Sequence, residues 1–182
     1  MNKLKSELIA EVIKREGGYV NDPTDRGGET KYGITVAVAR ENGFPGDMKY
    51  LRYEIAFSIY EQRYWDTLKL DNICELNEEL AKQLFDFCVN SGVSTAGKCL
   101  QNVLNVLNKQ GTLYPDLFTD GILGSKTLTA LKKFIEHRKQ DGLKLLAEVV
   151  RGQRISFCID IAMRDQTQER YQYGWLTRVV NL

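Results

Sequence analysis

The sequence of 182 residues has few of the residues that support metal or nucleophilic chemistry. It contains one histidine, His137, and four cysteines, with no Cys-x-x-Cys pair among them. Structural zinc sites need clustered cysteine and histidine ligands, so neither a metal site nor a cofactor is expected. A Ser-His or Cys-His catalytic pair would have to use His137, whose neighbours instead indicate a solvated helix face. The cysteines allow two disulfides in an oxidising compartment, and buried free thiols are the favoured interpretation.

Excess charge and long apolar runs are also missing. The formal net charge is +1, which argues against a nucleic-acid partner. No stretch approaches the roughly 20 apolar residues of a membrane span. The first seven residues, 1–7, lack the apolar run of a signal peptide. We therefore expect synthesis in the cytoplasm without a signal peptide.

Strand-like alternation is almost absent, and apolar residues recur mostly at helical spacing. The sequence predicts a mainly α fold, with at most a small hairpin within residues 19–35. The irregular segment 92–97 marks a boundary between domains at 1–93 and 94–182. Helices are expected from the N-terminus to Glu16 and over 35–42, 51–68, 77–89, from 96, from 125, 142–163 and 171–178.

The stretch from Glu16 to Thr35 contains five glycines and four acidic residues. The preceding helix has an apolar stripe, and continuing that stripe by three or four positions reaches Glu16. Gly17 and Gly18 then stop the helix. A carboxylate therefore occupies a position where the pattern calls for a core residue, as suits a general acid. The alternative is a solvated last-turn glutamate beside a simple turn.

Asp25 follows Glu16 by nine residues, and Thr30 follows Asp25 by five. The glycines, Pro23 and the Asn/Asp cluster favour tight turns, so the chain can fold back on Glu16. Two carboxylates and a hydroxyl would then face one cleft. Paired carboxylates in unlike surroundings suit the cleavage of a glycosidic bond.

The motifs Glu-Gly-Gly-Tyr, Asp-Pro-x-Asp-x-Gly-Gly-x-Thr and Tyr-Gly-Ile-Thr stand in this stretch. In them the sequence resembles the phage-type N-acetylmuramidases of glycoside hydrolase family 108, which are lysozyme-like enzymes. The resemblance implies that Glu16 is the catalytic acid. The order of Glu16, Asp25 and Thr30 is also similar to the acid, carboxylate and threonine triplet of other phage lysozymes. Asp22 is a competing second carboxylate.

The resemblance extends more loosely along the chain. The Tyr-x-x-x-Tyr-Trp order at residues 60–65 is similar to the family's, and of its aromatics Tyr60 and Trp65 are assigned to packing. Leu100-Gln101 and the turn Asp120-Gly121-Ile122-Leu123-Gly124 resemble the peptidoglycan-binding half that accompanies this family. We therefore expect a lysozyme-like helical catalytic part with a C-terminal helical peptidoglycan-binding part packed against it. The expected substrate contacts are Asp22, Tyr32, Tyr64 and Asp120.

The leading hypothesis is a peptidoglycan hydrolase that cuts the β-1,4 bond between N-acetylmuramic acid and N-acetylglucosamine. One alternative is a lytic transglycosylase on the same substrate, and another is a wall-binding module without turnover. The expected partner is bacterial peptidoglycan in the periplasm, reached through a holin or another export route by a monomer. Retention or inversion depends on the separation of the carboxylates and is left open, as is a phage or a bacterial role.

Overall fold

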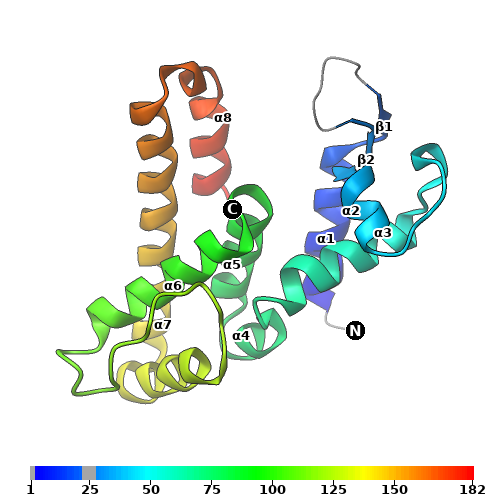
Figure 1. Ribbon diagram of the computed structural model, residues 1–182. Coiled ribbons are helices and arrows are strands. Elements are labelled where there is room, and N and C mark those ends of the chain that lie inside the picture. The colour runs from blue at the N-terminus through cyan, green and yellow to red at the C-terminus, as the bar shows by residue number, and fades with distance from the viewer. Residues whose placement is uncertain (1–2, 22–27) are drawn as a thin grey trace. The chain divides into compact units, whose positions relative to one another are not determined.

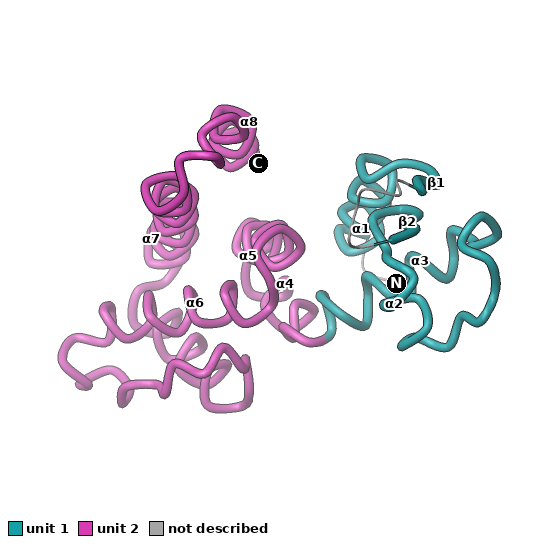
Figure 2. The backbone as a smooth tube through the Cα atoms, turned by 45° about the horizontal axis from the view of Figure 1, so that its top comes forward, with its two compact units in different colours: residues 1–66 teal, residues 67–182 magenta. Residues whose placement is uncertain are grey.

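The computed structural model describes residues 3–21 and 28–182. The chain divides into two compact units, Met1–Asp66 and Thr67–Leu182, which Figure 2 colours separately. Helices make up most of both units (Figure 1), which confirms the expected mainly α fold.

The first unit begins with α1, Lys3–Glu16, whose buried face contains four residues of the predicted stripe. These four are Leu8, Ile9, Val12 and Ile13. The helix ends where the glycines predict, because Gly17 adopts a left-handed conformation with φ 80°. The unit continues with α2 (Val36–Glu41), η1 (Met48–Tyr50), α3 (Tyr53–Tyr60) and η2 (Glu61–Asp66).

A small antiparallel sheet follows α1, where a hairpin at most was expected. Its strands β1 (Tyr19–Val20), β2 (Thr30–Lys31) and β3 (Ile34–Thr35) lie in the order β1-β2-β3. Lys31 pairs with Ile34, so Tyr32 and Gly33 form a two-residue turn. Both turn residues have positive φ, 56° and 74°, as a hairpin turn of this length favours.

The single helix expected over 51–68 is divided in the structure. Helix α3 ends at Tyr60, and the chain continues as the wider π-helix η2. Lys69 then adopts a left-handed conformation, φ 54°, immediately before the next helix. A π-helix has more residues per turn than an α-helix, so a 3.6-residue period does not detect where one begins. The apolar pattern therefore predicted one helix where the structure has two elements.

The second unit is a group of helices around α5. Asn77 caps the start of α5 by accepting a hydrogen bond from the backbone N–H of Leu80. Helix α5 contacts α4, α6 and α7, and α8 contacts α7. The helices are α4 (Leu70–Leu76), α5 (Glu78–Ser91), α6 (Val93–Leu107), α7 (Ser125–Arg164) and α8 (Glu169–Val180), with η3 (Gln166–Gln168) before α8.

Helix α7 changes direction at Lys139, where the backbone leaves the helical region with φ 53° and ψ −149°. Figure 1 shows the two segments running in different directions. The break falls between the two helices that the sequence predicts, from Ser125 and from Gly142. The second segment lies beside α8 (Figure 1), and the two helices are in contact.

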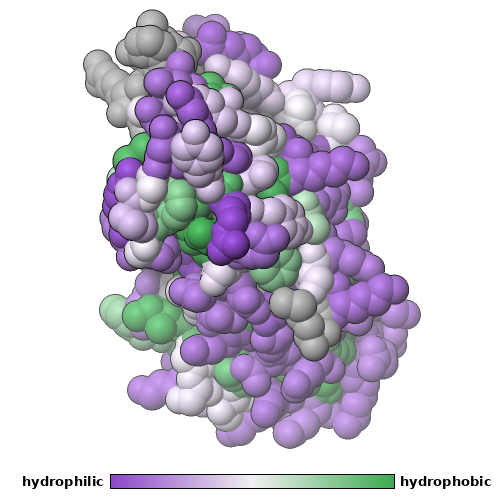
Figure 3. Space-filling model, turned by 90° about the vertical axis from the view of Figure 1, so that its right-hand side faces the viewer, coloured by the Kyte–Doolittle hydropathy of each residue, from purple (hydrophilic) through white to green (hydrophobic). Residues whose placement is uncertain are grey.

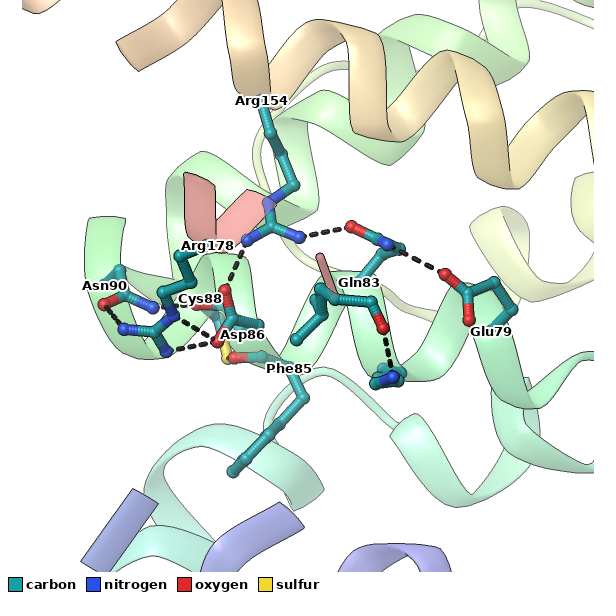
Figure 4. Close-up of polar contacts among 10 residues, drawn as sticks. Glu79, Gln83, Phe85, Asp86, Cys88, Asn90, Arg154 and Arg178 are labelled. Carbon is teal, nitrogen blue, oxygen red and sulfur yellow. Dashed lines mark hydrogen bonds and ion pairs between the residues drawn. The ribbon is translucent and has the colours of Figure 1, made fainter. Parts of the chain in front are cut away.

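A buried charged cluster joins three helices of this unit (Figure 4). Asp86 on α5 accepts hydrogen bonds from Arg154 on α7 and from Arg178 on α8, where the distance from Arg178 Nε to Asp86 Oδ1 is 2.9 Å. Arg178 also donates to Asn90 at 2.6 Å, and Arg154 donates to Gln83. Asp86 therefore has a structural role, since it links α5 to α7 and α8.

Hydrophilic side chains dominate the face drawn in Figure 3, where hydrophobic ones form small separate patches. Within the described part of the chain, no helix is both long and apolar enough to cross a membrane. Cys74 and Cys88 are buried, Cys99 and Cys158 are half-buried, and all four are free thiols. Cys74 and Cys88 agree with the favoured interpretation of buried free thiols, whereas Cys99 and Cys158 are less buried than it predicts.

Candidate active site

Glu16 is the last residue of α1, at the edge of the first unit's core. Its side chain is 37% exposed, with Oε1 3.7 Å from Nε of Arg15. The expectation of a carboxylate at a core position of the stripe is therefore wrong, because Glu16 is exposed. The stripe reaches the helix end, where solvent covers part of the side chain. A partly exposed carboxylate beside a glycine turn remains able to reach a substrate.

The turn between β2 and β3 packs directly against Glu16. A Cβ atom added to Gly33 would lie 2.8 Å from Cγ of Glu16 and 2.7 Å from the hydroxyl oxygen of Tyr60. Only glycine fits there, because the space is absent and φ is positive. Glu16, Gly33 and Tyr60 therefore meet at one point, although they come from α1, a turn and α3.

Tyr60 is the residue that this arrangement adds to the predicted site. It is 4% exposed, and its hydroxyl donates a hydrogen bond to the backbone carbonyl of Tyr32 at 3.0 Å. Burial, and then the nearby charge of Glu16, raises the pKa of the Tyr60 hydroxyl, which keeps it protonated as a donor. The sequence assigned Tyr60 to packing. Its proximity to Glu16 in the structure indicates that it also belongs to the candidate site.

The predicted aromatic contacts Tyr32 and Tyr64 both adjoin Tyr60. The ring of Tyr64 stacks on that of Tyr60 with centroids 5.5 Å apart. Tyr32 donates its backbone N–H to the carbonyl of Gly17 at 3.1 Å, and Nζ of Lys31 lies 5.2 Å from the centroid of its ring. These two tyrosines and Glu16 thus belong to one region of the first unit.

The other predicted residues have different positions. Thr30 lies on β2 opposite Val20 and Thr35, so it belongs to the same small sheet as the turn. Asp22 and Asp25 lie outside the described residues, and their roles stay predictions. Asp120 lies in the second unit, where its Oδ1 accepts hydrogen bonds from Gln101 at 2.8 Å and from the N–H of Ile122 at 2.8 Å.

The described geometry suits an acid at the edge of a polar, aromatic-lined region. Glu16 supplies a carboxyl group, the tyrosines supply flat apolar faces of the kind that sugars contact, and Gly33 brings the backbone close. Within residues 3–21 and 28–182, no group of three or more His, Cys, Asp or Glu side chains could hold a metal ion.

Two families match the sequence, and together they span nearly all of it. Residues 9–92 match the family described as Glycosyl hydrolase 108. Residues 95–180 match the family described as Predicted Peptidoglycan domain. The first match includes Glu16, and it also covers α4 and α5, which pack in the second structural unit. The domain boundary at 93/94 was predicted from the sequence, whereas the division into compact units falls at 66/67.

A solved structure is similar along the whole chain. The structure of Brucella abortus SagA is 26% identical in sequence, with a TM-score of 0.69, and the similarity covers 100% of this chain and 92% of that one. No curated protein matches the sequence.

Proposed function

We propose a specific reaction from the two family matches, glycosyl hydrolase 108 over residues 9–92 and a predicted peptidoglycan domain over residues 95–180. The protein is a glycoside hydrolase directed at peptidoglycan. The bond that we propose it cleaves is the β-1,4 linkage between N-acetylmuramic acid and N-acetylglucosamine. The observation that carries the proposal is the position of Glu16 at the end of α1, against Gly33 and Tyr60.

In this proposal Glu16 donates a proton to the leaving glycosidic oxygen. A positioned general acid contributes typically ~10²–10⁴-fold to the rate. Asp25 stabilises the positive charge that develops on the sugar or activates water, and Thr30 holds that water. Tyr32 and Tyr64 support the sugar rings. The buried hydroxyl of Tyr60 binds the carbonyl of Tyr32 and so keeps the turn against Glu16.

The substrate suggests where the enzyme acts. Peptidoglycan lies outside the cytoplasmic membrane, so we propose that the protein works as a monomer in the periplasm after passing through a holin or another export route. A cell fractionation with an assay for sugar release in the periplasmic fraction tests this proposal.

Mass spectrometry of the soluble products from purified sacculi tests the reaction itself. Hydrolysis at the proposed bond leaves N-acetylmuramic acid at the reducing end. A 1,6-anhydro sugar would instead identify a lytic transglycosylase. Binding to sacculi without soluble sugars would identify a wall-binding module without turnover.

The Glu16→Gln variant tests the catalytic residue. Glutamine keeps the size of the side chain but has no proton to give, so we expect the release of reducing ends to fall by at least ~10²-fold. The melting temperature should change little, because the side chain is 37% exposed. Glu11→Gln, at an exposed position of the same helix, is the matched control and should keep full activity. A normal rate with a lowered melting temperature in Glu16→Gln would assign Glu16 a structural role only.

A further inference from the structure

A loop of the second unit, residues 108–124, joins α6 to α7 and is held by polar side chains of α6 and by its own Asn108. Asn105 accepts a hydrogen bond from the N–H of Leu117 at 2.7 Å and donates one to its carbonyl at 2.9 Å. Asn108 donates to Asp116 at 2.6 Å, and Asn102 accepts from Thr119 at 3.1 Å. This loop therefore has a defined conformation although it has no regular secondary structure.

Gln101 of α6 holds the last part of the loop by hydrogen bonds to residues 120–122. It is 2% exposed, and its Oε1 accepts a hydrogen bond from the N–H of Gly121 at 2.7 Å. Its Nε2 donates to Asp120 at 2.8 Å and to the carbonyl of Ile122 at 3.1 Å. The backbone of Gly121 also approaches Gly97 so closely that a Cβ on Gly97 would lie 2.1 Å from the carbonyl oxygen of Gly121.

This firmly held loop nevertheless exposes large apolar side chains. Phe118 is 84% exposed and Ile122 is 69% exposed. Both line a groove of about 820 Å³ between the loop and the first turns of α7. Ordering a loop costs conformational entropy, and a preorganised surface lowers the cost of binding a ligand. Exposed apolar residues on a preorganised loop are therefore suited to ligand contact.

The two walls of the groove differ in charge. Asp116 and Asp120 lie on the loop wall, and Lys126 and Lys133 lie on the helix wall. Within the described part of the chain, neither lysine forms an ion pair. The lysines are seven residues apart, two turns of one helix face, which corresponds to about 10 Å along the axis. An extended peptide covers that distance with about three residues.

We propose that this groove, lined by Phe118, Ile122, Lys126 and Lys133, binds the stem peptide of peptidoglycan. The assignment rests on the proposed function, which names peptidoglycan as the substrate. Stem peptides carry free carboxylates that fit the two lysines, and a diamino acid adds an amine that fits the loop carboxylates. The N-acetylated sugars of the glycan carry no charge, so they cannot form ion pairs with the charged residues of the groove. Phe118 and Ile122 contact the apolar parts of the peptide.

A titration of the full-length protein with the synthetic peptide L-Ala-γ-D-Glu-meso-diaminopimelate-D-Ala tests the proposal. We expect backbone amide chemical shifts in an NMR spectrum to move within residues 114–133. The double variant Lys126→Glu/Lys133→Glu should weaken binding of the peptide about tenfold. Each substitution replaces a solvent-exposed attraction between lysine and a peptide carboxylate by a repulsion. Lys132→Glu is the matched control: it is exposed on the same helix but does not line the groove.

A second pair of variants tests the apolar contact. Phe118→Ala should weaken peptide binding without lowering the melting temperature, because its ring is almost fully exposed. Val106→Ala, at an exposed position of α6 outside the groove, should leave binding unchanged. Shifts elsewhere in the protein, equal affinity in the double variant, or equal perturbation of the same amides by an N-acetylglucosamine tetramer would each overturn the proposal.

The peptide contains no glycosidic bond, so its binding is measured independently of hydrolysis. If the proposed function fails, sacculi will release no sugars while the titration still gives its own result. If only the groove assignment fails, sacculi will be hydrolysed but the peptide will not perturb residues 114–133.

Discussion

At the scale of single residues, the contact between Glu16, Gly33 and Tyr60 is the most informative feature of the first unit. Gly33 has no room for a Cβ, and its backbone brings the turn against the carboxyl-bearing side chain. Tyr60 binds that turn through the carbonyl of Tyr32. In the proposed reaction Tyr60 is thus a positioning residue, since it acts through the turn.

Replacing Tyr60 by phenylalanine tests this role. Tyr60→Phe removes the donor and leaves a partly buried carbonyl without its partner, which costs about 1 kcal/mol of stability. If the turn also positions Glu16, the rate of hydrolysis of sacculi should fall about tenfold, beyond any loss caused by the lower stability. Stability and the rate of reducing-end release are measured on the same sample.

Tyr114→Phe is the matched control, because the hydroxyl of Tyr114 also donates to a backbone carbonyl, that of Leu104, at 2.9 Å in the second unit. Tyr114 lines the proposed peptide groove but not the candidate active site, so the variant should lose similar stability and keep the wild-type rate when sacculi are saturating. An equal loss of activity in both variants would mean that Tyr60 acts through stability alone.

At the scale of elements, the cluster around Asp86 joins α5, α7 and α8. One carboxylate with 7% side-chain exposure serves two arginines, Arg154 and Arg178. Desolvation by burial lowers the pKa of Arg154, and the charge of Asp86 opposes that shift. The burial of these charges is therefore acceptable only while Asp86 is present.

We expect Asp86→Ala to destabilise the second unit by about 3–5 kcal/mol, because it leaves buried positive charge uncompensated. Chemical denaturation measures the change. Asp160→Ala removes an exposed aspartate of α7 and serves as the control, with little expected effect. A small effect of Asp86→Ala would show that water reaches the arginines and replaces their partner.

Asp120, in the loop that ends at Gly124, should make the stability of the protein depend on pH. The hydrogen bond from Gln101, followed by that from the N–H of Ile122, lowers the pKa of Asp120 from its ordinary 3.8. A lowered pKa in the folded state stabilises the protein above the unfolded-state pKa, and this stabilisation is lost as the pH falls through the folded-state value. The difference in melting temperature between wild type and Asp120→Asn should therefore be constant above about pH 5 and shrink toward pH 3.

Asp141→Asn is the control for this measurement, as Asp141 is exposed on α7. Its melting temperature should follow the wild type at every pH. A difference for Asp120→Asn that stays constant down to pH 3 would contradict the assigned role of the ionised carboxylate.

At the scale of the whole molecule, the family matches and the compact units divide the chain at different places. The matches meet between residues 92 and 95, whereas the units meet between 66 and 67. Helix α5 belongs to the glycosyl hydrolase match and lies in the core of the second unit. Its buried residues include Leu80, Leu84, Phe85 and Phe87.

A fragment of residues 67–182 should therefore fold cooperatively, while one of residues 94–182 should not. The shorter fragment exposes the surfaces of α6 and α7 that α5 covers, and it leaves Arg154 and Arg178 without Asp86. Thermal melting followed by near-ultraviolet circular dichroism compares the two. A cooperative transition of residues 94–182 at the same temperature would show that α5 contributes little.

The sequence by itself determined the features that depend on residues a few positions apart. The stripe of α1, its end at Gly17 and the break between the segments of α7 all follow from local spacing and local conformational preference. The mainly α fold and the family motif around Glu16 were readable for the same reason.

Only the tertiary structure decided which distant residues meet. Tyr60 binds the carbonyl of a residue 28 positions away, and Asp86 binds an arginine 68 positions away. Neither pairing has a signature in local spacing, because it depends on how helices pack. The exposure of Glu16 was decided in the same way, since a stripe specifies a face of the helix but not how far the neighbouring elements cover it. The groove beside Phe118 exists because Gln101 and Gly97 hold a loop about 20 residues further along the chain.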